Sequence, residues 1–253
     1  SWKFEWAKEM VDTSKQMGFP LLAGSSLPVT WRMPSVEMPD NAPIEEALVV
    51  AYGATDVYDF HALETLQCMM ERRAGGETGV RSVQALKGEA VWTAMGTAKN
   101  TDGCSRRLFE ACLSRSQTLA QGESFSHRYP TPSQMREWVK EPIAYRIEYN
   151  DGTRATMLLM NGLVTDFTFA AKLKGQRDPL STLFYLPPNP NVAYSAALME
   201  NAEKMFMTGK APYPVERTLL TSGLVEAGLH SLAKGQQRLP TPHLAINYRP
   251  SKE

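Results

Sequence analysis

The amino-acid sequence predicts an α/β protein, of the α+β kind, whose open and mostly antiparallel sheet is covered by helices on one face. Three observations favour this class. Residues 143–149 alternate apolar and polar side chains before an Asn-Asp-Gly turn, which is typical of a strand that enters a hairpin. Residues 214–234 have a long helical pattern with proline at its start and glycine after its end. Residues 4–24 predict a helix followed by a buried strand.

The first part of the chain is predicted as this helix and strand. Apolar side chains recur at steps of three and four over residues 4–17, and Gly18 is expected to end the helix. Residues 19–24 form a short apolar run before a glycine, which indicates a buried strand of the parallel type. Because this strand has no earlier strand to pair with, we interpret the unit as the end of a domain whose beginning is absent. Residues 25–43 hold four prolines and are expected to be extended.

The middle of the chain alternates strand and helix patterns. Residues 44–52 predict a strand, and residues 57–73 predict a helix with one apolar stripe. The glycine-rich run at 75–79 follows this helix rather than preceding one, so we interpret it as a turn and not as a phosphate loop. Further predicted elements are a strand at 80–87, helices at 89–95 and 105–116, and a short helix that ends at Val139.

The second half predicts an antiparallel meander with one packed face. Asn150-Asp151-Gly152 and Asn161-Gly162 supply its turns, because these residues tolerate positive φ. The predicted strands are residues 143–149, 154–160, 163–172 and 180–186. A helix at 194–208, the long helix at 214–234 and an edge strand at 243–248 complete the chain.

Composition limits the partners. The 27 Lys and Arg residues balance 27 Asp and Glu residues, so we expect neither nucleic acid nor an anionic membrane surface as a partner. No run approaches the roughly 18 apolar residues of a membrane helix. Three cysteines without a C-x-x-C pair disfavour a disulfide framework or a structural zinc site. A reducing, cytoplasmic location is therefore expected.

The first candidate site is the start of the helix predicted at 57–73. Residues 56–64 combine three carboxylates with one of the four histidines. His61 and Glu64 share a helix face, and Asp56 is placed to cap the helix. A histidine near a carboxylate is a candidate general acid or base, because its pKa lies near physiological pH. The alternative is a helix cap with a half-buried structural histidine.

A metal site on the same helix face is a further alternative, with Cys68 joining His61 and Glu64 as ligands. A two-turn face rarely closes a metal site alone, so we assign no metal ligand. The other histidines, His127, His230 and His243, are interpreted as structural or solvated.

The second candidate site is residues 25–32, which follow the carboxyl end of the predicted strand, where α/β sheets bind ligands. Arg32 would hold a carboxylate, a phosphate or a sugar hydroxyl, and Trp31 would stack on a sugar ring. The alternative is a surface salt bridge and a buried aromatic side chain. No G-x-G-x-x-G, P-loop, G-x-S-x-G or H-E-x-x-H motif occurs in the sequence.

Several segments resemble one family. The family is that of the Gfo/Idh/MocA oxidoreductases, relatives of glucose–fructose oxidoreductase and inositol dehydrogenase. The segments follow one another in the same order as the corresponding segments of that family. They are A-K-E-M-V at 7–11 with G-F-P-L-L-A-G at 18–24, D-F-H-A-L-E at 59–64, and the helix at 214–232. They resemble that family's last Rossmann helix and strand, its catalytic-histidine segment and its terminal helix. The family's aspartate four residues before the histidine is replaced by Val57.

The resemblance implies two domains and a reaction. Residues 1–30 would be the remnant of a Rossmann-type domain, and residues 31–253 a substrate-binding and oligomerisation domain. The family transfers hydride between a sugar or polyol carbon and NAD or NADP. Its glycine loop and its Glu-Lys-Pro motif lie N-terminal to the helix that opens this chain, so the cofactor cradle would not be in this chain.

The resemblance also implies site residues and a homo-oligomer. His61 is the candidate catalytic acid/base, with Asp59 beside it. Substrate binding is assigned to Ser25, Trp31, Arg32, Asp56 and Tyr58, and cofactor contact to Ser26. The free face of the sheet would join the subunits, with Phe167 and Phe169 as the expected contact residues.

Two other functions stay open from the residues alone. One is a non-catalytic module that binds a sugar or a protein partner. The other is a metal-dependent lyase or isomerase that uses His61 and Glu64.

Overall fold

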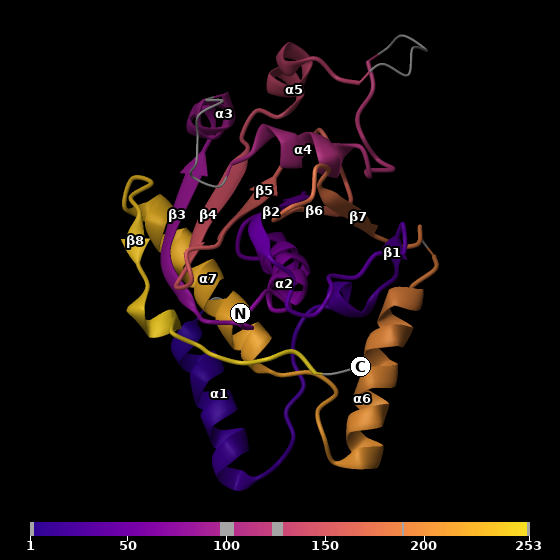
Figure 1. The fold of residues 1–253 in the computed structure, drawn as a ribbon, viewed down its shortest axis with the longest axis vertical. Coiled ribbons are helices and arrows are strands. Elements are labelled where there is room, and N and C mark those ends of the chain that lie inside the picture. Colours follow the sequence, from indigo (N-terminus) through magenta and orange to yellow (C-terminus); the bar gives the residue numbers. More distant parts are fainter. Residues whose placement is uncertain (1–2, 97–103, 123–128, 189, 252–253) are drawn as a thin grey trace.

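The computed structural model describes residues 3–96, 104–122, 129–188 and 190–251 (Figure 1). Their centre is an eight-stranded sheet of order β1-β7-β6-β2-β5-β4-β3-β8. The pair β2 and β5 is parallel, and the other neighbouring strands are antiparallel. The strands are β1 Arg32–Met33, β2 Ile44–Ala51, β3 Val80–Lys87, β4 Ile143–Tyr149, β5 Arg154–Leu159, β6 Phe167–Leu173, β7 Leu180–Phe184 and β8 Leu239–Pro240.

Helices cover both faces of this sheet. The α-helices are α1 Phe4–Met17, α2 Tyr58–Met70, α3 Glu89–Gly96, α4 Arg106–Leu113, α5 Pro132–Trp138, α6 Ala193–Thr208 and α7 Glu216–Ala233; η1 Leu27–Val29 and η2 Pro242–Leu244 are 3-10 turns. The longer helices α2 and α7 pack on one face, and α4 lies on the opposite face (Figure 1). The predicted α/β class and the mostly antiparallel sheet are confirmed. The prediction that helices cover only one face of the sheet is wrong, because α4 buries its apolar side chains against the opposite face.

The strands predicted from alternation are present, but they do not form a continuous meander. The hairpin between β4 and β5 turns at residues 150–152, as expected. Strand β2 then lies between β5 and β6. Its Ala47 and Val49 face one core and its Leu48 and Val50 face the other. A strand that is apolar on both faces is stable only in the middle of a covered sheet, which explains its position.

The two phenylalanines of β6 do not lie on a free sheet face. Phe167 and Phe169 belong to the core beneath α2 and α7 and are 2% and 0% exposed. The prediction that they form a subunit contact is therefore wrong. The neighbouring Ala170 points to the other face, where it packs in the core around α4. Whether the protein forms a homo-oligomer stays a prediction.

The N-terminal segment is only partly as expected. Helix α1 has the predicted bounds, and Gly18 ends it with a left-handed φ of 71°. Residues 19–24 are not a strand. No strand edge among the described residues accepts them, and they run beside α7, where the Ala23 carbonyl accepts a hydrogen bond from the Thr218 hydroxyl (3.0 Å). The division of the chain at residue 30 stays a prediction.

The remaining differences concern the ends of two elements and one strand that is absent. Helix α2 stops at Met70, ahead of the predicted end at 73, and β6 begins at Phe167 instead of 163. The edge strand predicted at 243–248 is absent; that segment holds the end of η2 and an isolated bridge between Glu77 and Tyr248. None of the helices in the described ranges is long and apolar enough to cross a bilayer.

Candidate functional site

The first turn of α2 is held by a buried carboxylate. Asp59 is fully buried, and its carboxylate accepts hydrogen bonds from the Phe60 amide and from the Tyr145 hydroxyl, both at 2.9 Å. Burial raises the pKa of Asp59, and these hydrogen bonds oppose that shift. Asp59 therefore links α2 to β4, and a catalytic role for Asp59 stays a prediction.

The predicted cap of α2 is not made by Asp56. Asp56 is exposed and has a φ of 63°, in the left-handed region. The residue at the cap position is Val57, which makes no side-chain hydrogen bond to the helix. The strained backbone at Asp56 lets the chain turn sharply from β2 into α2, so the helix begins close to the end of the strand.

His61 is oriented by a serine from the N-terminal segment. Ser25 Oγ lies 2.7 Å from Nδ1 of His61, and the same oxygen accepts the Leu27 amide at 3.2 Å. The serine is buried, whereas the histidine is half-buried. Nε2 of His61 makes no hydrogen bond to any residue within the described ranges. Ser25 thus fixes the orientation of the His61 ring through Nδ1.

Aromatic side chains surround the histidine. The rings of Tyr58 and Phe60 meet it edge-on, with centroid distances of 5.9 and 5.7 Å. Tyr58 is itself stacked on Phe167 and packed against Tyr52. Burial in this setting lowers the pKa of His61 below its usual 6.5, so the imidazole is neutral at physiological pH. A neutral imidazole next to aromatic rings can accept a proton from a hydroxyl group.

Glu64 completes the support of Ser25. Its carboxylate is fully buried between α2 and α7 and accepts from the Thr221 hydroxyl (2.6 Å) and the Ser25 amide (3.4 Å). Burial raises the pKa of Glu64, and nearby Arg217 lowers it. The sequence placed Glu64 on the His61 face; the structure shows that Ser25 links the two. Thr221 was missed, since one threonine in an apolar helix gives no signal.

Gly24 makes this arrangement possible. A Cβ atom at Gly24 would lie 2.7 Å from Glu64 Oε2 and 2.8 Å from Thr218 Oγ1, and the glycine has a φ of +127°. Only glycine has both the space and the backbone freedom required there. Gly24 therefore allows the backbone to approach α2 and α7, which places Ser25 next to His61.

The other predicted ligand residues lie apart from His61. Arg32 is buried, with its guanidinium 3.9 Å from the centre of the Phe184 ring and a hydrogen bond to the Pro28 carbonyl (2.9 Å). Trp31 is 53% exposed. Of the alternative interpretation, the buried aromatic side chain is wrong, because Trp31 is exposed; a salt bridge is present, between Arg32 and Glu37 (3.2 Å), but its arginine is buried. Ser26, the predicted cofactor contact, is half-buried at the start of η1.

Of the predicted site residues, the structure brings Ser25, Tyr58 and His61 together. Within the described ranges, no group of three His, Cys, Asp or Glu side chains is placed to hold a metal ion. Cys68 donates instead to the Thr65 carbonyl. His230 and His243 are exposed, and His127 lies outside the described residues.

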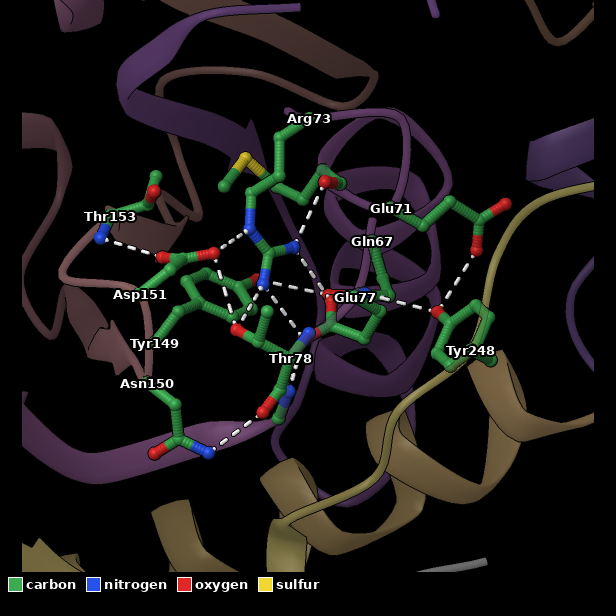
Figure 2. A network of polar contacts seen from close by, with 12 residues as sticks. Gln67, Glu71, Arg73, Glu77, Thr78, Tyr149, Asn150, Asp151, Thr153 and Tyr248 are labelled. Atoms are coloured by element: carbon green, nitrogen blue, oxygen red, sulfur yellow. Dashed lines mark hydrogen bonds and ion pairs between the residues drawn. The ribbon is translucent and has the colours of Figure 1, made fainter. Parts of the chain in front are cut away.

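A buried ionic network holds the opposite end of α2 (Figure 2). Arg73, which is 1% exposed, makes two bonds to the Glu77 carboxylate (2.8 and 2.9 Å) and one to Asp151 (2.6 Å) in the β4–β5 turn. Its guanidinium lies 4.2 Å from the centre of the Tyr149 ring. Glu77 comes from the glycine-rich run, which is a turn, as predicted.

The network continues to the C-terminal segment and α7. Tyr248 donates to Glu71 (2.9 Å) and accepts from Gln67 (3.0 Å), as Figure 2 shows. Arg217 of α7 pairs with the same Glu71 carboxylate through Nε (2.9 Å) and Nη2. These partners satisfy the buried charges and fix α2 between the sheet, α7 and the tail, which in turn fixes His61.

The described residues do not fit a dinucleotide cofactor. Such a cradle needs a glycine-rich turn between a parallel strand and a helix. The sequence has no G-x-G-x-x-G motif, and residues 19–24 form no strand. We therefore assign no cofactor contact to the described residues from geometry.

The sequence matches no protein-family profile and no curated protein. Among solved structures, similar chains are the WlbA dehydrogenase from Bordetella pertussis in complex with NADH and UDP-GlcNAcA (12% identity, TM-score 0.47, 96% of this chain and 69% of that chain) and the aldose-aldose oxidoreductase from Caulobacter crescentus complexed with glycerol (12%, 0.44, 94% and 68%). A third is a super-repressor mutant of Gal80p from Saccharomyces cerevisiae (9%, 0.48, 98% and 72%).

These three structures are of the Gfo/Idh/MocA type that the sequence resembles. The identities to this chain are 12% or lower, and all three TM-scores lie below 0.5. The likeness says nothing about a reaction or a ligand of the present chain.

Proposed function

We propose that this chain is the substrate-binding part of a Gfo/Idh/MocA-like oxidoreductase that acts on a sugar or polyol, with His61 as the acid/base group for the substrate hydroxyl. The observation that supports this is the 2.7 Å contact between Ser25 Oγ and His61 Nδ1. It holds a neutral imidazole in one orientation, in which Nε2 has no hydrogen-bond partner among the described residues. The sequence resemblance supports the class of reaction.

The proton chemistry follows from the two ring nitrogens. Oxidation of an alcohol to a carbonyl requires that the hydroxyl proton be removed, and a neutral imidazole accepts such a proton near neutral pH. When Nδ1 carries its hydrogen toward Ser25 Oγ, Nε2 has a free lone pair for this proton. In the reverse direction, the imidazolium returns the proton to the oxygen. Ser25 keeps Nδ1 bonded in both states.

The aromatic side chains would place the substrate. The rings of Tyr58 and Phe60 both contact the His61 ring, and their apolar surface would meet the C–H groups of a sugar bound there. Asp59 acts through the helix, because its carboxylate faces Tyr145. Roles in substrate binding for Asp56, Trp31 and Arg32, and in cofactor contact for Ser26, stay predictions. NAD or NADP enters this proposal only through the resemblance.

The test is equilibrium binding of glucose, sorbitol and inositol by titration calorimetry. We expect at least one to bind, and His61→Ala to weaken that binding by about tenfold or more, while the exposed His230→Ala leaves it unchanged. No binding of any of the three, or equal binding by His61→Ala, would rule the proposal out. Because the described residues do not fit a dinucleotide, we expect this chain on its own to bind the sugar without turning it over when NAD or NADP is added.

A further inference from the structure

Asn161, in the turn after β5, holds the loop that leads from β2 into α2. At the end of the β2–β5 ladder, the Met160 amide donates to the Ala51 carbonyl (2.8 Å). Beyond that point the Asn161 side chain continues the pairing. Its Oδ1 accepts the Gly53 amide (2.7 Å), and its Nδ2 donates to the Gly53 carbonyl (2.9 Å). One side chain thus pairs with both polar groups of one residue, as the backbone of a neighbouring parallel strand does.

The turn itself does not explain why residue 161 is an asparagine. Of the Asn161-Gly162 pair, only the glycine has a positive φ, of +94°. A Cβ atom at Gly162 would also lie 2.5 Å from the Trp138 carbonyl oxygen, so glycine is required there. Asn161 needs no such backbone freedom. We therefore attribute its role to the side-chain amide that binds Gly53.

Gly53 connects this amide to an aromatic ring of the candidate site. Gly53 has a φ of +97°, and a Cβ atom there would overlap the Tyr58 side chain, 2.6 Å from Cδ1. The Tyr58 side chain therefore lies directly on the Gly53 backbone. On its other sides the ring stacks on Phe167, with a centroid distance of 6.5 Å, and contacts Tyr52 at 5.0 Å. Phe167 is held in the core, so the Gly53 side of this packing is the one that Asn161 fixes.

The Tyr58 ring passes this constraint on to His61, which it meets edge-on at a centroid distance of 5.9 Å. The two bonds between Asn161 and Gly53 are exposed to solvent. Their loss should therefore free the loop locally and leave the core folded, because exposed segments open at a lower free energy than core strands. A role in positioning the ring is thus separable from a role in global stability.

We propose that Asn161 is a positioning residue of the candidate site, which fixes the Tyr58 ring beside His61 through the Gly53 backbone. Asn161 acts through these two residues, so we assign it no catalytic role. The inference rests on the proposed function for the kind of ligand that meets Tyr58. The position of the ring is a property of the free protein, and it is measured without a ligand.

The first experiment follows the ring C–H resonances of His61 by NMR in the unliganded protein. These resonances depend on where the aromatic ring of Tyr58 lies. We expect them to shift in Asn161→Ala, and to shift less in Asn161→Asp, which keeps an acceptor for the Gly53 amide but has no donor for its carbonyl. Unchanged His61 resonances in Asn161→Ala would overturn the proposal.

Two control variants separate positioning from general effects. Asn150 lies in the turn between β4 and β5 and also donates one hydrogen bond to a backbone carbonyl (2.7 Å), so Asn150→Ala should leave the His61 resonances in place. Gly53→Ala should shift them more than Gly152→Ala does, since Gly152 also has a positive φ (+86°) but nothing lies within 4 Å of its added Cβ. Equal shifts in each matched pair would contradict the proposal. If Gly53→Ala does not fold, the exposed Asn161 variants decide the question.

The second experiment connects the ring to binding. Titration calorimetry with glucose, sorbitol and inositol should show that Asn161→Ala weakens the polyol that binds best about three- to tenfold, while Asn150→Ala leaves its affinity unchanged. Shifted His61 resonances with an unchanged affinity would overturn the role of Asn161 in the substrate site. Binding of none of the three polyols would refute the proposed function, and the His61 resonances would still decide whether Asn161 positions Tyr58.

Discussion

Ser25 Oγ lies 2.7 Å from Nδ1 of His61, although the two residues are 36 positions apart. The serine belongs to the irregular segment before η1, and the histidine to the first turns of α2. Their contact is possible because Glu64 binds the Ser25 amide and Gly24 lets the backbone approach. The orientation of the candidate acid/base group thus depends on how this irregular segment is fixed to two helices.

Replacing Ser25 with alanine should release the histidine ring. The variant loses the bond to His61 and leaves the buried Leu27 amide without its acceptor, so we expect a loss of about 1–2 kcal/mol in the free energy of unfolding. Affinity for the polyol that binds best should fall about tenfold, because Nε2 is no longer oriented. Urea denaturation and titration calorimetry measure both effects. Ser26→Ala is the control, and an equal loss of polyol affinity there would show that the Ser25 contact is not specific.

Folding stability should decrease with acid through His61. Burial lowers its pKa below 6.5, so between pH 6.5 and that lower value the unfolded chain binds a proton that the folded chain does not. The raised pKa values of Asp59 and Glu64 have the opposite effect to that of His61. Their contribution to the stability of the folded protein decreases as pH rises above the usual pKa values of 3.8 and 4.5. The difference between wild type and His61→Gln isolates the histidine and should shrink as pH falls below 6.5. A difference that is constant from pH 5 to 8 would mean that the pKa of His61 is not shifted.

Gly24→Ala should be far more harmful than Gly18→Ala. At Gly24 the new Cβ would meet Glu64 and Thr218 at 2.7 and 2.8 Å, whereas at Gly18 nothing lies within 4 Å. Both glycines have positive φ, so backbone strain alone costs about 1–2 kcal/mol in each. Crowding at Gly24 should add about 2 kcal/mol more. Chemical denaturation of the two variants checks this, and similar losses would indicate that Gly24 does not approach α2.

Arg73→Lys should destabilise the protein although the charge is kept. Lysine cannot make the paired bonds to Glu77 together with the bond to Asp151, so buried carboxylate oxygens lose their donors. We expect a loss of about 3 kcal/mol in the free energy of unfolding. The exposed Arg107, paired with Asp178, provides the control, and Arg107→Lys should give no measurable change. A small effect at Arg73 would show that the ionic network does not hold α2 in place.

Phe167→Ala tests the correction to the sheet face. Phe167 is 2% exposed beneath α2, so the cavity left behind should cost about 3–5 kcal/mol. Phe206 of α6 is 80% exposed, and Phe206→Ala should cost less than about 0.5 kcal/mol. Sedimentation velocity should show no change in oligomeric state for folded Phe167→Ala. Clean dissociation of an oligomer without loss of stability would instead restore Phe167 to a subunit contact.

The local patterns predicted most elements, because periodicity and turn residues act within a few residues. The ends of α1 and the turn between β4 and β5 are decided by Gly18 and by Asn150-Asp151-Gly152, and both were predicted correctly. The position of β2 between β5 and β6 depends on which strands compete for a central place. The strands that pair with β2 lie more than a hundred residues from it in the sequence, so a local pattern does not predict this order.

The candidate site was predictable in part. His61 was found because it is a rare residue at the start of a helix, and Ser25 because it followed an apolar run. The predicted strand that drew attention to Ser25 is absent, so a residue that contacts His61 was selected from a wrongly predicted element. Asp59 was placed beside His61 in sequence, yet adjacent helix residues point in different directions, and its carboxylate faces Tyr145.

The most direct test of the central claim is a titration of histidine-labelled protein with glucose and sorbitol, followed by nitrogen NMR of the His61 ring. If His61 serves the substrate hydroxyl, Nε2 should shift as the polyol saturates, Nδ1 should stay bonded to Ser25, and His230 should not respond. Saturation with a polyol that leaves both ring nitrogens of His61 unchanged would show that the histidine does not face the substrate and would contradict the account.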